Sequence, residues 1–396
     1  MHRRSILLCI WFCSTVRAQV VMRSLEPGES GRLYPSDAAI LDLREVRTSL
    51  PCAVKQLRPE LGFDLAFHTG YEVRLHLRDL ASGGGDVLTS IFRVTPDSNP
   101  DRPVFFEQKW RVPAIPEDAN GATALQGGFA LGEGDYQVDW LIRDKSERVC
   151  SAYWKISTRM PSKEGTTVAG LPPGTVLETE SDKYSEPEIS RQEMGKSLTV
   201  SILLNVAPQR PGAPVISPAE SDALVSMLRG IFRDPRIGRF SLTAFNLDLR
   251  QVIFQKQGVR EIDFNDLKKV ISDLNLGTVT LSRLAEKNAE ARFLVHLAAE
   301  QTQSSRPDAI IFLGPKSADD TGVSREPLKQ LADVSCPVFY LTYTPQDLNP
   351  WRDLIGSAVK YLRGREFSIS RPLDMVSAWS KIMTQLSQGN SLRTEK

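Results

Sequence analysis

The stretch Leu198-Thr199-Val200-Ser201-Ile202-Leu203-Leu204-Asn205, followed by Val206-Ala207-Pro208-Gln209, decides the fold of the C-terminal half of the chain. It is apolar almost without a break, which is typical of a parallel strand buried on both faces of a sheet. Downstream, Ser217-Pro218-Ala219-Glu220 predicts a helix start, because serine caps, proline suits the first helical position and glutamate completes a capping box. A strand followed by a helix indicates an α/β domain.

Strand and helix patterns continue to alternate through residues 197–388, and the last residues, 389–396, are expected to be a tail. Strands are predicted at Phe240–Leu247, Gln251–Gln255, Ala309–Leu313, Val338–Thr342 and Glu366–Ile369. The first two of these are expected to form a hairpin. A long helix is predicted over Leu281–Gln303, and a final helix would bury Val376, Trp379, Met383 and Leu386. This alternation predicts a doubly wound α/β domain, whose sheet is covered on both faces by helices.

Residues 28–158 are predicted to be all-β, because short apolar or alternating runs are separated there by turn-forming residues. The predicted strands are Ala39–Leu43, Phe63–Phe67, Tyr71–Leu77, Val87–Val94, Val104–Val112, Gly128–Leu131, Tyr136–Arg143 and Arg148–Ser157. Strands at this spacing predict a β-sandwich. Residues 159–196 are rich in Pro, Ser, Thr, Glu and Gly and are interpreted as a linker.

One local pattern sharpens the prediction for the N-terminal half. Leu131, Gly134, Tyr136 and Val138 follow the L-x-x-G-x-Y-x-V form of a tyrosine corner, in which a buried tyrosine hydroxyl binds the upstream backbone. An ordinary tyrosine on a strand is the alternative. On this motif, the N-terminal half resembles immunoglobulin-like or fibronectin-like modules.

Residues 1–18 have the form of a secretory signal peptide, with a basic start, an apolar core and small residues before Gln19. The apolar core is too short to span a bilayer, and we expect no membrane span elsewhere. The mature protein is therefore predicted to be exported, to the periplasm or beyond the cell. Removing Arg3, Arg4 and Arg17 leaves 46 basic and 48 acidic residues, a net charge of −2.

Three cysteines remain in the predicted mature chain. Cys52 and Cys150 bracket the β-rich region and are predicted to form a disulfide, since disulfides persist outside the cytosol. Cys336 is interpreted as a small buried hydrophobic residue at the start of a strand. The alternative is that all three are free thiols.

The C-terminal half resembles a von Willebrand factor type A (VWA) domain in the order and spacing of its elements. The segment Phe240–Phe245 resembles the second strand of that family, Leu276-Gly277-Thr278 resembles the loop before its long third helix, and Ala309–Leu313 resembles its fourth strand. Together with an immunoglobulin-like module, this half resembles exported bacterial proteins that carry VWA-related domains.

The family's metal site uses D-x-S-x-S after the first strand, a threonine before the third helix and an aspartate after the fourth strand. This chain has Asn205, Ala207 and Gln209 at the first motif, Thr278 at the second and Gly314 at the third. Both carboxylates are missing, and a hard dication needs carboxylate charge among its oxygen ligands. We therefore predict no metal and no cofactor.

The resemblance implies an exported, non-catalytic binding protein that contacts an unidentified protein partner without metal. Asn205, Gln209 and Thr278 would form the partner-binding rim; the alternative is that Asn205 and Thr278 merely tie loops together. Two other functions remain open, namely an exported hydrolase with an active site between the domains and a purely structural envelope component. The basic cluster of Lys360, Arg363 and Arg365 is too small for a nucleic-acid footprint, so no nucleic-acid partner is expected.

Overall fold

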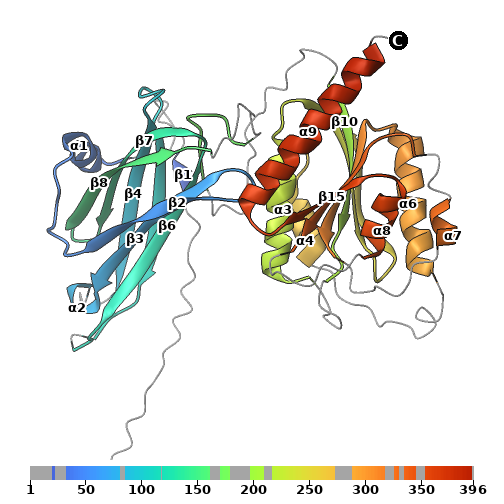
Figure 1. The fold of residues 1–396 in the computed structure, drawn as a ribbon. Helices are drawn as coiled ribbons and strands as arrows, with labels where there is room; N and C mark the ends of the chain where they lie inside the picture. The colour runs from blue at the N-terminus through green and yellow to red at the C-terminus, as the bar shows by residue number, and fades with distance from the viewer. Residues whose placement is uncertain are drawn as a thin grey trace, which may run out of the picture. The chain divides into compact units, whose positions relative to one another are not determined.

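The computed structural model describes residues 20–22, 33–80, 85–116, 118–160, 170–178, 197–208, 216–272, 288–316, 325–329, 334–344 and 353–394. The predicted signal peptide and most of the predicted linker lie outside these residues. The described residues have a mixed α/β architecture with three sheets, and the chain divides into two units (Figure 1). The first unit comprises the described residues within Met1–Glu60, Phe67–Arg159 and Pro172–Asp182, and the second those within Leu61–Ala66, Met160–Leu171 and Lys183–Lys396.

The first unit contains two sheets. The five-stranded sheet has the order β1 (Val20–Met22), β5 (Val104–Val112), β4 (Asp86–Pro96), β7 (Gly134–Arg143) and β8 (Val149–Thr158). The four-stranded sheet has the order β2 (Ala53–Leu61), β3 (Phe67–His76), β6 (Ala122–Leu131) and β9 (Val176–Glu178). Neighbouring strands pair antiparallel, as in the ten-residue register between β7 and β8.

Buried aromatic residues from both sheets fill the first unit. Tyr71 on β3 lies 5.4 Å from Phe92 on β4 and 5.1 Å from Trp140 on β7, measured between ring centroids. Phe92 in turn stacks on Phe106. The Tyr71 hydroxyl lies 3.0 Å from the Ser90 hydroxyl, so the buried phenol oxygen has a partner on the opposite sheet.

The predicted all-β region also contains two helices, α1 (Pro35–Leu43) and α2 (Leu77–Leu80), so the strand prediction at Ala39–Leu43 is wrong. Proline at the first helical position favours α1, and its Leu41 packs into a small cluster with Ile91 and Leu141.

The strand predicted at Phe63–Phe67 is also wrong. Residues 62–66 form the turn between β2 and β3, in which Gly62 N donates to Ala66 O and Leu65 has a φ of 59°. Leu65 and Ala66 are buried in this turn and Phe63 is half-buried, and a strand pattern read from hydrophobicity alone cannot distinguish a buried turn from a buried strand.

The tyrosine-corner hydrogen bond is present. The Tyr136 hydroxyl lies 3.0 Å from Gly132 O, upstream in the chain, and 3.3 Å from Thr175 O. Thr175 belongs to the predicted linker, so that prediction is wrong for residues 170–178. Gly174, with a φ of 74°, forms a turn that leads into β9, which pairs with β6. The Pro and Gly residues interpreted as linker composition are turn residues here.

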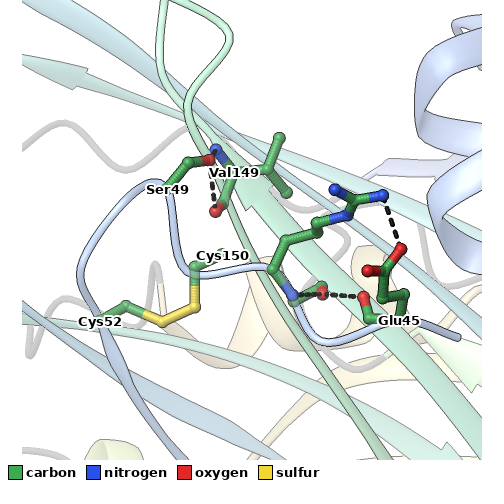
Figure 2. Close-up of a disulfide and its surroundings, with 7 residues drawn as sticks. Glu45, Ser49, Cys52, Val149 and Cys150 are labelled. Atoms are coloured by element: carbon green, nitrogen blue, oxygen red, sulfur yellow. Dashed lines mark hydrogen bonds and ion pairs between the residues drawn. A yellow bond between two sulfur atoms is a disulfide. The ribbon is translucent and has the colours of Figure 1, made fainter.

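The predicted disulfide joins Cys52, at the start of β2, to Cys150 on β8 (Figure 2). Its Cα atoms lie 6.3 Å apart, and 98 positions separate the two cysteines in sequence. Cys336 is half-buried rather than buried as predicted, and it packs against the apolar core of the second unit.

The second unit is built on a six-stranded sheet. Its strand order is β12 (Gln251–Val259), β11 (Ile237–Asn246), β10 (Leu198–Asn205), β13 (Ala309–Pro315), β14 (Val338–Tyr343) and β15 (Arg365–Ile369). Pairing is parallel except between β11 and β12, which form the predicted hairpin. The near-continuous apolar run of β10 fits its central place, since it is paired on both sides.

Helices cover both faces of this sheet (Figure 1). One face packs against α3 (Pro218–Phe232), α4 (Phe264–Ser272) and α9 (Pro372–Thr394). The other packs against α6 (Ala289–Ser305) and α8 (Leu354–Tyr361), and α7 (Arg325–Leu328) lies beside α6. The predicted capping box at the start of α3 is present, with Ser217 and Glu220 bonding reciprocally.

Two predicted helix ends differ from the described structure or lie outside it. The start predicted for the long helix, residues 281–287, lies outside the described residues, which begin again at Asn288. The final helix continues to Thr394, so the tail predicted from residue 389 is wrong there. Gly389 weakens a helix by only about 1 kcal/mol and no proline follows it, so nothing in the sequence forces a stop. Among the described residues, none of the helices has the length and apolarity needed to cross a bilayer.

Candidate functional site

The carboxyl ends of the parallel strands form the candidate site, because open α/β sheets place ligands at this edge. β10 ends at Asn205, and the pairing of Leu204 with Leu313 brings that end beside Gly314 on β13. Gly314 pairs in turn with Thr342 on β14. The parallel pairing therefore places Asn205 beside Gly314, two of the positions compared above with a metal site. Gln209 and Thr278 lie outside the described residues.

Asn205 is completely buried, and its side chain bonds to the backbone of three segments. Its Oδ1 accepts hydrogen bonds from Ala207 N at 3.1 Å and from Leu247 N at 3.3 Å. Its Nδ2 donates to Pro315 O at 3.5 Å. Asn205 therefore ties loops together, which is the alternative that the sequence left open, and it lies beneath the surface rather than on it.

Gly314 occupies the position where the resemblance places the second aspartate of a metal site. Its φ is 151°, a conformation that side-chain-bearing residues rarely adopt. A Cβ atom here would lie 2.4 Å from Asn205 O and 3.0 Å from Asn205 Cβ. The sequence shows that the carboxylate is missing, and the close approach of the two backbones explains why no side chain fits.

A buried hydrogen-bond network continues from this point through Tyr340 and Asp353. The Tyr340 hydroxyl lies 3.2 Å from Pro315 O and 3.1 Å from Asp353 Oδ2. Asp353 also caps α8, since its Oδ1 accepts from Gly356 N at 2.8 Å. Burial and the Asp353 carboxylate raise the pKa of Tyr340 well above its ordinary value, so the phenol stays protonated.

This network was not among the sites predicted from the sequence. An aspartate just before an apolar helix is a recognisable N-cap signal, and it could have identified Asp353. Its pairing with Tyr340 depends on which strand lies next to the helix start, and this is not encoded locally.

An ion pair with a buried lysine and an exposed glutamate links the end of β13 to β15. Lys316 Nζ, directly after β13, lies 3.6 Å from Glu366 Oε1 on β15, and Thr342 Oγ1 donates to the same oxygen at 3.3 Å. The acid of this pair is therefore matched by its own cation. In the part of the chain that the structure describes, no three His, Cys, Asp or Glu side chains gather in a way that could hold a metal ion.

Three helix starts at this edge are already capped by the chain itself. Ser217 and Glu220 cap α3, Asp353 caps α8, and Asp374 Oδ2 accepts from Ser370 N and Arg371 N before α9. Free N–H groups at helix starts commonly bind phosphate or other anions. Here these side chains already use several of the donors, so the described edge is suited to neither a dication nor a phosphate.

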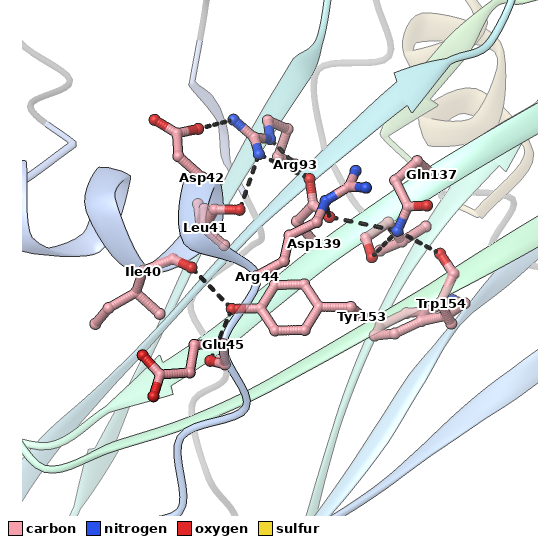
Figure 3. Close-up of polar contacts among 11 residues, drawn as sticks. Ile40, Leu41, Asp42, Arg44, Glu45, Arg93, Gln137, Asp139, Tyr153 and Trp154 are labelled. Atoms are coloured by element: carbon pink, nitrogen blue, oxygen red, sulfur yellow. Dashed lines mark hydrogen bonds and ion pairs between the residues drawn. The ribbon is translucent and has the colours of Figure 1, made fainter.

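A second polar cluster lies in the first unit, where α1 meets the five-stranded sheet (Figure 3). Asp139 is completely buried, and its carboxylate lies 3.0 Å from Arg44 Nε and 2.9 Å from Arg93 Nη2. Arg93 also donates to Asp42 at 2.6 Å and to Leu41 O at 3.0 Å. The ion pairs of Asp139 and Asp42 with the two arginines therefore hold α1 and the segment after it against the sheet.

Comparisons with known proteins add little to this geometry. No protein-family model matches the chain, and no curated protein matches it. Among solved structures, one similar chain is the Paenibacillus sp. cycloisomaltooligosaccharide glucanotransferase complexed with cycloisomaltoheptaose. The sequence identity is 10% and the TM-score is 0.17, and the match covers 73% of this chain and 44% of the glucanotransferase. Another is a glycosyl hydrolase family 2 member from Bacteroides cellulosilyticus DSM 14838, with 11% sequence identity and a TM-score of 0.19. That match covers 79% of this chain and 38% of the hydrolase. The chain spans less than half the length of either protein, and similarity this weak carries no functional argument.

Proposed function

We propose that this chain is an exported, non-catalytic binding protein that recognises a protein partner without metal. In this proposal the first unit is an immunoglobulin-like sandwich and the second a VWA-like domain. The six-stranded sheet order, with an antiparallel strand at one edge and helices on both faces, supports the second assignment. The tyrosine-corner hydrogen bond of Tyr136 supports the first.

The observation that carries the proposal is the closed contact between Asn205 and Gly314. A metal-dependent edge needs carboxylates at these two positions, whereas here one residue is an amide with three hydrogen bonds to backbone and the other has no room for a side chain. Partner recognition at this edge would therefore use the segments that follow β10, β13 and β14, with Gln209 and Thr278 as contact residues. Asn205, which is buried, would not contact the partner. It would hold the starts of these segments in place through its hydrogen bonds to their backbone.

Site-specific photo-crosslinking can test this proposal. A crosslinking residue is placed at Gln209 or Thr278 in the mature protein, and as a matched control at Arg239, an exposed residue near the opposite end of β11. We expect one partner protein to crosslink from positions 209 and 278 and not from 239, with equal yield in chelator and in Mg²⁺. Crosslinking that requires Mg²⁺, or that is equal at all three positions, would contradict the proposal.

Thermal melting gives an independent check on the metal. Addition of Mg²⁺ or Mn²⁺ should leave the melting temperature unchanged, because a ligand that binds the native state raises it. A rise that depends on metal concentration would contradict the proposal that recognition needs no metal.

A further inference from the structure

β8 is the last strand of the five-stranded sheet, and its outer edge is covered by an arm, residues Glu45–Leu50 (Figure 2). Leu50 N donates to Val149 O at 3.0 Å, and Ser151 N donates to Arg47 O at 3.0 Å. Ser49 Oγ accepts from Val149 N at 2.8 Å. The arm therefore satisfies backbone groups that an uncovered edge strand would offer to another chain.

The arm has almost no apolar anchorage. Residues 42–49 are all exposed, including Leu43 at 69% and Val46 at 65%, and only the last residue of the arm, Leu50, is buried. A segment with one buried side chain and half-buried hydrogen bonds opens locally at a lower free-energy cost than the sheet itself. A covalent bond beside it would hold it more firmly.

The disulfide lies where this hold is needed. Cys150 stands between Val149 and Ser151, the two β8 residues that bond to the arm, and Cys52 follows the arm by two positions. Cys52 is half-buried, which leaves this end of the bond partly accessible to a reductant. We propose that the arm Glu45–Leu50 is a redox-controlled latch, closed on the β8 edge while Cys52 and Cys150 are bonded and opened locally when they are reduced.

The reductant in this proposal is a dithiol. It supplies two electrons and two protons, the sulfur–sulfur bond breaks, Cys52 and Cys150 become thiols, and the dithiol closes to its own disulfide. Opening stays local because the chain before the arm has other attachments. Arg93 donates to Leu41 O, and the Tyr153 hydroxyl donates to Ile40 O at 2.9 Å. The β8 edge would thus be closed only after the chain reaches an oxidising compartment.

Amide hydrogen exchange on the mature chain, before and after treatment with dithiothreitol, tests the latch. We expect the amides of Leu50 and Ser151 to exchange at least ten-fold faster after reduction. Amides of Ile91 and Leu141, in the pairing between β4 and β7, serve as the reference and should keep their rate. Unchanged exchange at Leu50 and Ser151 would overturn the proposal, and so would faster exchange throughout the unit, because that is global unfolding rather than a latch.

Two variants test whether the Cys52–Cys150 disulfide, and not the third cysteine, holds the arm closed. The double variant Cys52→Ser/Cys150→Ser should match the reduced protein, and Cys336→Ser should match the oxidised wild type. If the double variant does not fold, Ser49→Ala in the oxidised protein is decisive, because it removes the side-chain bonds to Val149 and keeps the disulfide. We expect its arm to stay protected; an opening as large as that caused by reduction would show that hydrogen bonds alone hold the arm.

Discussion

Asp139 in the first unit and Asn205 in the second are both completely buried polar residues on central strands, and they differ in what surrounds them. Asp139 is surrounded by donors, from Arg44, Arg93 and the side-chain amide of Gln137. Asn205 meets two N–H donors and one carbonyl acceptor. Donors alone favour a carboxylate, whereas a mixed set needs an amide, so the neighbours decide which residue a buried position tolerates.

Gly314 gives the strongest test of this comparison, because its conformation and its contact with Asn205 both exclude a side chain. We expect Gly314→Ala to lower the free energy of unfolding by about 4 kcal/mol or more, since a Cβ would overlap backbone. The control is Gly258→Ala, whose φ is 62° with no atom within 4 Å of the added Cβ, and which should cost about 1 kcal/mol. Urea denaturation measures both, and equal losses would remove the steric argument.

Asp139→Asn should cost about 2–3 kcal/mol, because the amide loses the charge that faces Arg44 and Arg93 and turns a donor toward them, although Asp42 still pairs with Arg93. The same substitution at Asp135, whose ion pair with Arg159 is exposed on both sides, should leave stability unchanged. Chemical denaturation of the two variants compares them directly. If Asp139→Asn is as stable as the wild type, a donor-only environment does not require a carboxylate.

Asn205→Asp is the reciprocal change, and it should cost about 1–3 kcal/mol, since a carboxylate cannot donate to Pro315 O. The matched control is Asn246→Asp, because Asn246 Oδ1 accepts from Leu249 N and a carboxylate keeps that contact. Thermal melting with and without Mg²⁺ reports both stability and binding. A melting temperature that rises with Mg²⁺ in Asn205→Asp would mean that a single carboxylate suffices to create a metal site.

Tyr136→Phe is expected to have the smallest effect, about 1 kcal/mol at neutral pH, from loss of the corner hydrogen bond to Gly132 O. Burial raises the pKa of Tyr136 to about 12, above the ordinary value of 10. The contribution of the hydroxyl is therefore complete below pH 10 and declines as the pH rises toward 12. Unfolding measured at pH 7, 10 and 11.5 should show the difference between wild type and variant shrinking, and a difference that stays constant would contradict this prediction.

The sequence predicted best the features whose physical signals come from residues close together in the chain. The apolar run of β10, the capping box at Ser217 and the tyrosine-corner spacing each depend on residues close together in the chain, and all three features are present. Predictions failed where tertiary contacts decide, as at Ala39–Leu43, which is helical in α1, and at Thr175, which leads into β9.

For the candidate site, the sequence revealed the missing carboxylates but not the reason for their absence. Whether Asn205 lies on the surface or beneath it depends on the approach of Leu247 and Pro315, which are 42 and 110 positions away in sequence. Likewise, nothing near Tyr340 indicates that it will bond to Asp353. Residue identity at a position is readable from sequence, whereas the donors and acceptors around it come from the packed strands.

The contact between Gly314 and the backbone of Asn205 also has an evolutionary consequence. A lineage of this protein that gained an aspartate at position 314 would first lose stability, because the strand backbones must move apart before the new side chain fits. An aspartate at position 205 would add its own cost, because it cannot donate to Pro315 O. Each of the two carboxylates that a dication site would need here is therefore destabilising when it arises alone.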